Sequence, residues 1–191
     1  MKRITITLAL SMLILIPALA AKAQTTTFTG TAVIYGMGRN TRTITRTFTL
    51  RINDITSDSE ANRILSVLAD DGQDALLRSI DDKELGRFSL GANVGVPVNA
   101  VLVDKADGQT RIRVIFARWI GFGELRYGRR SVDYPFSYLE LLIDPRTGEG
   151  EGTYFQAARI RSRGGNTIEV EDFGTFPSRL MGVRMRGRPL S

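Results

Sequence analysis

DYPFSYLELLIDPRTGEGEGTYFQAARI, residues 133–160, predicts a β-hairpin around which the rest of the chain is organised. Its first arm, residues 134–143, is rich in aromatic and aliphatic side chains, which favour strands. Residues 144–148 predict the turn, because Pro145 presets φ, Asp144 can bond the backbone two residues on, and Gly148 can take a positive φ. The second arm runs from Gly150 to Ile160. We therefore expect an antiparallel strand pair here.

Strand patterns recur on both sides of this hairpin. They occupy residues 25–35, 41–52, 85–90, 94–103, 110–119, 167–173 and 178–185. The run 41–52 alternates, with threonines at every odd position from Thr41 to Thr49, and Asp107–Gly108 is a hairpin turn signal. Short strands with regularly spaced turns are typical of sandwiches and barrels. We expect an α+β fold, predominantly antiparallel β, as a sandwich or barrel of about 8–10 strands.

A helical pair interrupts the strands at about residues 57–80. Ser57 and Glu60 form a capping-box pattern, with acidic residues in the first turn. Apolar side chains then follow at helical spacing, at Ala61, Ile64, Leu65 and Leu68. Gly72 can end this helix, and a second short helix is predicted at about residues 74–80. This spacing indicates helices that flank the sheet.

The N-terminus predicts export. Residues 1–23 combine a basic start, an apolar run and the small-x-small motif Ala21-Lys22-Ala23, which is typical of a cleaved signal peptide. Cleavage after Ala20 and an uncleaved anchor helix are the alternatives. We expect residues 24–191 to form a single β-rich domain, exported to the periplasm or beyond the cell and soluble once the signal peptide is removed, with no stable membrane span.

The composition excludes several kinds of chemistry. The chain has no histidine and no cysteine, which removes Ser-His-Asp and Cys-His catalysis, thiol redox chemistry and ordinary zinc or copper sites. We expect no cofactor and no metal. Loss of residues 1–23 would lower the formal charge from +6 to +3, because Lys2, Arg3 and Lys22 are removed. The remaining basic residues are mostly arginines, which suit ion pairs and anion contacts.

Arginines alternate with aromatic residues at positions 118–130, a pattern that can bind anionic glycans through guanidinium forks and ring stacking. Export argues against nucleic acid as the partner. An ordinary exposed sheet surface would give the same pattern. The candidate ligand-binding residues from this segment and the hairpin are Arg118, Trp119, Arg126, Tyr134, Phe136, Tyr138 and Glu140.

Carboxylates are the candidate acid and base groups. Two pairs of glutamates lie on one face of a predicted strand, namely Glu149 with Glu151 and Glu169 with Glu171. Glycosidases use two carboxylates at a similar separation, but an ordinary strand that faces solvent gives the same separation. Glu140 differs from these, because its parity places it with Tyr138 and the other rings of the first hairpin arm.

Three segments carry a resemblance. They are Gly72 to Leu76, Asp133 to Phe136 followed by Leu139-Glu140-Leu141, and Asn166 to Gly174 with Pro177 and Leu180. Together they resemble a family of small, secreted, uncharacterised bacterial proteins. The resemblance covers most of the chain after residue 23, and its motifs are structural. That family has no established activity, so the resemblance implies no catalytic residue.

Three functions fit the sequence. The first is an exported, non-enzymatic β-rich protein that binds a small apolar or anionic ligand or an envelope partner such as an anionic glycan. The second is a carboxylate-dependent hydrolase of envelope glycans that uses Glu140 or another acid beside a second carboxylate in a cleft. The third is a structural or assembly protein of the envelope that uses exposed strand edges. The oligomeric state is open.

Overall fold

The computed structural model describes residues 25–35, 42–118, 130–164, 167–173 and 176–190. The predicted signal peptide, Trp119 and Arg126 lie outside these ranges. The strands are β1 (Thr26–Ile34), β2 (Ile44–Ile52), β3 (Gly86–Leu90), β4 (Val96–Val98), β5 (Ala100–Ala106), β6 (Gln109–Ala117), β7 (Phe136–Ile143), β8 (Glu149–Ser162), β9 (Ile168–Asp172) and β10 (Ser178–Arg186). The helices are α1 (Asp58–Asp70), α2 (Gln73–Ile80) and the short 3-10 helix η1 (Arg130–Asp133).

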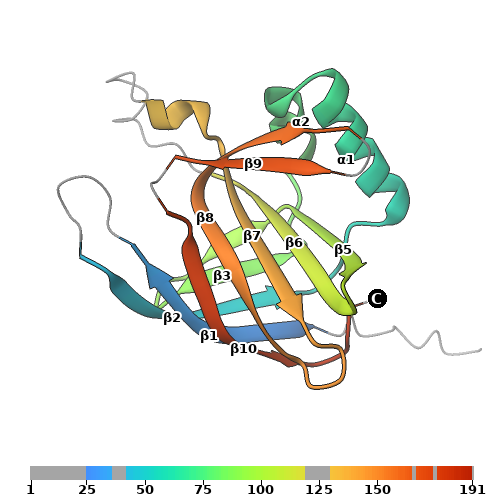
Figure 1. Cartoon of the computed structure of the whole chain (residues 1–191). Coiled ribbons are helices and arrows are strands. Elements are labelled where there is room, and N and C mark those ends of the chain that lie inside the picture. Colours follow the sequence, from blue (N-terminus) through green and yellow to red (C-terminus); the bar gives the residue numbers. More distant parts are fainter. Residues whose placement is uncertain (1–24, 36–41, 119–129, 165–166, 174–175, 191) are drawn as a thin grey trace, which may run out of the picture.

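The strands form one antiparallel sheet that curls into a nearly closed barrel (Figure 1). Its order is β4-β3-β2-β1-β10-β8-β7-β6-β5, with β9 paired to β8 off this path. The two end strands, β4 and β5, are consecutive in the chain. Asn99 separates these two strands in the chain, and its backbone N–H donates to the carbonyl of Ile115 in β6 at 3.0 Å. The predicted fold class is confirmed, and the strand order favours the barrel over the sandwich.

The hairpin predicted at residues 133–160 is β7–β8. The Arg146 N–H donates to Oδ1 of Asp144 at 2.8 Å, and Gly148 has a φ of 69°. Gly150 and Gly152 lie so close to β7 that an added Cβ would meet the carbonyl oxygens of Leu142 and Glu140. Glycine at these two positions therefore allows β8 to pair closely with β7 without a steric clash.

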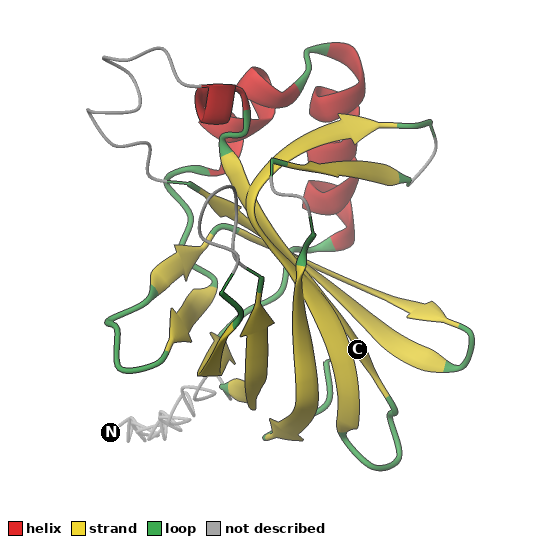
Figure 2. Cartoon of the chain, turned by 60° about the vertical axis from the view of Figure 1, so that its left-hand side comes forward, coloured by secondary structure: helices red, strands yellow, loops and turns green. Residues whose placement is uncertain are grey.

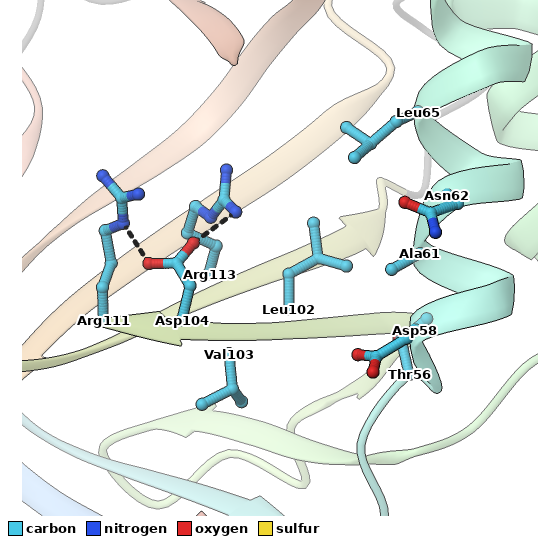
Figure 3. A pocket seen from close by; sticks show the side chains of 10 residues that line it. All are labelled: Thr56, Asp58, Ala61, Asn62, Leu65, Leu102, Val103, Asp104, Arg111 and Arg113. Carbon is cyan, nitrogen blue, oxygen red and sulfur yellow. Dashed lines mark hydrogen bonds and ion pairs between the residues drawn. The ribbon is translucent and has the colours of Figure 1, made fainter. Parts of the chain in front are cut away.

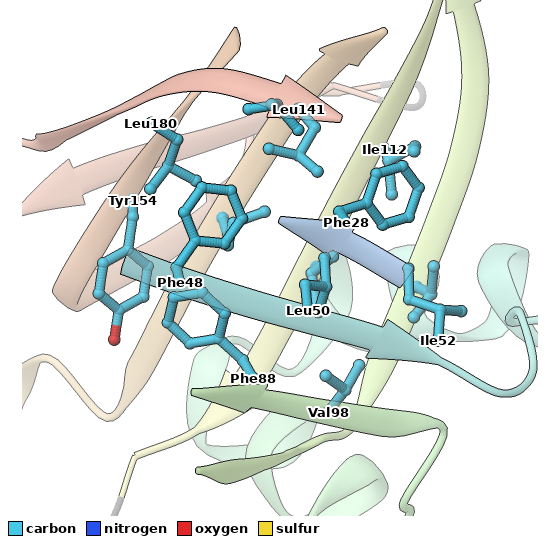
Figure 4. Packing of buried hydrophobic residues seen from close by; sticks show 14 of the residues in the cluster. Phe28, Phe48, Leu50, Ile52, Phe88, Val98, Ile112, Leu141, Tyr154 and Leu180 are labelled. Carbon is cyan, nitrogen blue, oxygen red and sulfur yellow. The ribbon is translucent and has the colours of Figure 1, made fainter. Parts of the chain in front are cut away.

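Aromatic and aliphatic side chains fill the barrel (Figure 4). The Phe88 ring is central among them, with ring centroids 4.8 Å from Tyr154, 5.5 Å from Phe116 and 6.1 Å from Phe48. All four of these residues are buried. They come from β2, β3, β6 and β8, so this cluster connects strands that are far apart in the sequence, and burial of its rings stabilises the curled sheet.

The helical pair packs on the outer face of β5 to β8, beside the β8–β9 hairpin (Figure 2). Ile64 and Leu68 of α1 and Leu76 and Ile80 of α2 are buried in this second core, together with the ring of Phe136. The predicted limits of the insert, 57–80, agree with α1 and α2. None of the described helices is long and apolar enough to cross a bilayer.

The strand predicted at residues 94–103 is divided in the structure. It separates into β4 and β5 at Asn99, which is buried. The Asn99 side chain donates to the carbonyl of Lys83 at 2.9 Å and accepts from the N–H of Ala117 at 2.7 Å. These bonds anchor the chain where it leaves the edge of β3 and joins β6. The buried Asn99 amide therefore links the segment before β3 to the end of β6.

The capping box at the start of α1 forms in part. The N–H of Glu60 donates to Oγ of Ser57, but the Glu60 carboxylate binds Arg63, at 2.6 Å, and also Lys83. The hydrogen bond from Arg63 contributes most, followed by that from Lys83, and together they lower the pKa of Glu60 from 4.5 to about 2. Because Lys83 lies beyond α2, this carboxylate connects α1 to the segment that leads into β3.

We expect Glu60→Gln to lower the free energy of unfolding at pH 7 by about 1 kcal/mol, a figure reduced from the pKa shift because the pair is partly exposed. A carboxyl group whose pKa is depressed by folding stabilises the protein above its unfolded pKa, near 4.5, and loses that contribution as the pH falls towards 2. In urea denaturation at pH 7, 4 and 3, the difference in the free energy of unfolding between wild type and Glu60→Gln should therefore become smaller as the pH falls. A difference that stays constant with pH would contradict this assignment.

Candidate functional site

A groove of about 390 Å³ lies between α1 and the outer face of β5 and β6. We call it the α1 groove (Figure 3). Its helix side presents Asp58, Ala61, Asn62 and Leu65, and its sheet side presents Leu102, Asp104, Arg111 and Arg113; Thr56 and Val103 complete the lining. Of the pockets described, this one brings together the most charged side chains, so it is the candidate binding site.

The position of α1 over the sheet creates this groove. The Thr56 N–H donates to the Val101 carbonyl at 3.0 Å, and the Val101 N–H donates to Oγ1 of Thr56 at 2.9 Å. These two bonds fix the start of α1 to β5. Beyond them Leu65 and Leu102 are buried, while the small side chain of Ala61 leaves space between helix and strand. The groove is therefore held open by fixed backbone.

Two arginines bind one carboxylate at the sheet side of the groove. Arg111 donates from Nε to Oδ1 of Asp104 at 2.7 Å, and Arg113 donates from Nη2 to Oδ2 at 2.6 Å (Figure 3). Arg111 lies directly opposite Asp104 in the register, and Arg113 lies on the diagonal. The side chain of Arg113 is only 10% exposed, whereas that of Arg111 is 36% exposed. We call this arrangement the Asp104 clamp.

The polar network continues onto β7. Glu140 lies directly opposite Arg113 in the β6–β7 register, and its Oε2 accepts a hydrogen bond from the Tyr138 hydroxyl at 2.9 Å. Burial raises the pKa of the Tyr138 hydroxyl most, and the negative charge of Glu140 raises it further. The hydroxyl therefore remains a neutral donor. Charges therefore alternate across the outer face from Asp104 through Arg113 to Glu140.

The predicted site residues fall in three places. Tyr138 and Glu140 lie beside the α1 groove, whereas Phe136 is fully buried under the helices. Tyr134 and Arg118 lie together in a separate cluster near β9. There the Tyr134 hydroxyl donates to Glu171 at 2.5 Å, and Nε of Arg118 donates to the Tyr134 carbonyl at 2.9 Å. Trp119 and Arg126 lie outside the described residues, so their prediction stays untested.

The Asp104 clamp and the helix side of the groove were not among the predicted site residues. One signal for the clamp is present in the sequence. Counting outward from the two-residue turn at Asp107–Gly108 places Asp104 opposite Arg111. No comparable signal places Asp58 or Asn62 over that pair, because the packing of α1 on β5 depends on contacts distant in the chain.

Neither the groove nor the rest of the described chain gathers three acidic side chains closely enough to hold a metal ion. The groove instead offers carboxylate, guanidinium, amide and aliphatic groups. This chemistry suits hydrogen bonding to a small polar molecule. Comparisons of the chain with models of protein families, with curated proteins and with solved structures found no match.

Proposed function

We propose that this chain is an exported, non-enzymatic protein that binds one small, neutral, hydroxyl-rich ligand, such as a sugar unit of the cell envelope, in the α1 groove. The observation that carries the proposal is the make-up of the groove, which sets paired charged groups beside an aliphatic wall of Leu65 and Leu102. Its volume of about 390 Å³ falls within the range of small-molecule sites.

The balance of charges favours a neutral ligand. Asp58 and Asp104 face the groove with Arg111 and Arg113, so the lining has equal numbers of acidic and basic side chains. A charged ligand would find no surplus of opposite charge, whereas hydroxyl groups can both donate to carboxylates and accept from guanidinium groups. The balanced charges of the groove favour a neutral polar ligand over the apolar or anionic one expected from the sequence.

Preorganisation supports binding by the Asp104 clamp. Arg111 uses Nε for Asp104, which leaves its terminal nitrogens as donors. Each oxygen of Asp104 accepts one hydrogen bond and retains a further acceptor position. Because the arginine side chains are already ordered by the clamp, a ligand that binds here would not need to order them itself.

The export part of the proposal is supported by the signal-peptide pattern of residues 1–23 and by the resemblance to small secreted bacterial proteins. We expect N-terminal sequencing of the exported protein to start at Gln24. An intact Met1 on exported protein would contradict cleavage.

A glycan hydrolase is the second candidate. It is favoured by one observation: Asp104 and Glu140 lie on either side of Arg113, so two carboxylates occur on the same outer face. Their existing bonds to arginine and tyrosine favour a role in binding. If the protein cleaves envelope glycans, Glu140→Gln should abolish that activity, and unchanged activity would exclude Glu140 as the catalytic group.

The binding proposal is tested by native mass spectrometry of protein purified from its own host. Wild-type protein should carry an added mass that is lost on denaturation. Ala61→Trp, which fills the groove, should lose the added mass, whereas Ser66→Trp, at an exposed position of the same helix, should keep it. Circular dichroism of both variants checks that they fold, and Asn62→Ala with Asp58→Ala replaces Ala61→Trp if that variant does not. Wild type without added mass, or the same added mass in a folded groove variant, would contradict the proposal.

A further inference from the structure

Four adjacent strands, β3, β2, β1 and β10, have a composition unlike the rest of the chain. They contain no aspartate or glutamate. They carry six arginines, which are Arg46, Arg51, Arg87, Arg179, Arg184 and Arg186. Helices α1 and α2 pack elsewhere, on β5 to β8 (Figure 1). This part of the barrel wall is therefore basic, and neither of these helices covers it.

The register places three of these arginines in one line across the strands. Phe28, Leu50 and Phe88 of these strands point into the barrel, so the residues that alternate with them point outward. Arg87 lies directly opposite Arg51 in the β2–β3 pair. Thr27 lies opposite Arg51 on one side and opposite Arg186 on the other. We call the set Arg87, Arg51, Thr27 and Arg186 the arginine row.

Among the described residues, the arginine row is only partly neutralised by acidic side chains. Arg51 and Arg186 are exposed and have no ion pair with any residue that the structure describes. Arg87 binds Glu84, but both side chains are about half exposed, so solvent screens the pair. Two arginines directly opposite each other on neighbouring strands repel and destabilise a sheet. An anion bound between them would remove that repulsion.

Hydroxyl groups flank the row on one side. On the strand positions next to it, Ser89, Thr49 and Thr29 lie in one line, followed by Arg184. Thr47 and Thr31 form the next line. These side chains can donate to anionic oxygens and can donate to or accept from sugar hydroxyls. With strands about 4.8 Å apart, the row from Arg87 to Arg186 spans about 14 Å. This length is enough to contact several charged groups along a linear polymer.

We propose that this face binds an anionic polysaccharide, which lies across the strands along the arginine row. Arginine forks recognise carboxylate, sulfate and phosphate groups, and the flanking hydroxyls recognise the sugar. This site is separate from the α1 groove and does not depend on the function proposed there. It gives the exported protein a second, extended contact with envelope glycans.

The neighbouring residues favour a glycan over a membrane or a nucleic acid. The outward positions of these four strands carry no aromatic side chain, which single-stranded nucleic acids need for stacking. Binding to a bilayer surface requires large apolar groups that enter the lipid. The exposed Phe176 lies outside the four strands. Ile44 begins β2, seven positions before Arg51, and the exposed Met181 of β10 lies opposite Thr31, away from the row.

The test uses dextran sulfate as the anionic glycan and neutral dextran as its uncharged match. At about 150 mM salt, Arg51→Gln with Arg186→Gln should weaken binding of dextran sulfate at least about tenfold and lower the slope of log Kd against log salt by about 2. The control is Arg146→Gln with Arg163→Gln, which removes the same charge from strongly exposed positions. The control should change the affinity less than about twofold, and neutral dextran should not bind.

Stability separates a binding role from a structural one. Because Arg51→Gln relieves repulsion from Arg87, the melting temperature of the row variant should equal or exceed that of wild type. Equal losses of affinity in the row and control variants would show attraction by net charge alone and would overturn the proposal. So would binding to phosphatidylglycerol vesicles or single-stranded DNA that depends on the row while dextran sulfate does not bind.

Discussion

Replacing Phe88 with alanine is expected to lower the free energy of unfolding by about 4 kcal/mol. Phe88 is 2% exposed, and its ring touches those of Phe48, Phe116 and Tyr154. These rings come from four different strands, so the backbone around the cavity is fixed on all sides and cannot collapse into it. Urea denaturation followed by circular dichroism measures the loss.

Phe176→Ala is the matched control, because it makes the same change at a side chain that is 65% exposed. It should change the stability by less than about 0.5 kcal/mol. A Phe88→Ala variant as stable as the control would contradict a barrel filled by this ring cluster. A large loss in Phe88→Ala alone would support it.

The second large effect is expected at the Asp104 clamp. Asp104→Leu should lower the free energy of unfolding by about 2–3 kcal/mol, because Arg113 would lose a carboxylate while remaining mostly buried. A double-mutant cycle with Arg113→Met isolates the pair. Replacing both residues by apolar ones removes the arginine together with its Asp104 partner, so the double variant should be more stable than the sum of the single losses implies.

Glu151→Leu is the control for the cycle, since its ion pair with Arg179 spans 4.0 Å between two exposed side chains. It should alter stability by less than about 0.5 kcal/mol. Additive losses at Asp104 and Arg113 would contradict direct coupling in the clamp. Urea denaturation of the four proteins of the cycle decides between these outcomes.

Local signals in the sequence predict most elements of this fold. The turns at residues 144–148 and at Asp107–Gly108 form as expected, because Asp144, Gly148 and Gly108 provide the backbone geometry through their own chemistry. The helix beginning after Ser57 follows from its cap and from apolar spacing. Such features depend on residues a few positions apart, and a single sequence contains that information.

Long-range features could not be predicted in the same way. The pairing of β1 with β10 joins opposite ends of the described chain, and no local pattern specifies it. The alternation of side chains along a strand predicts that Phe136 and Tyr138 lie on the same face of β7. It does not predict that α1 and α2 cover that face. The α1 groove arises from this same packing, so the residues on its helix side could not be predicted, whereas the predicted Glu140 lies opposite Arg113 of its lining.

Amide NMR tests the location of the ligand most directly. Protein labelled with ¹⁵N in its own host is compared before and after its bound molecule is removed by unfolding and refolding. The largest chemical-shift differences should occur at Thr56, Asn62, Asp104 and Arg111, with little change at Phe48, Phe88 and Tyr154. Largest differences at the rings inside the barrel, or identical spectra, would contradict binding in the α1 groove.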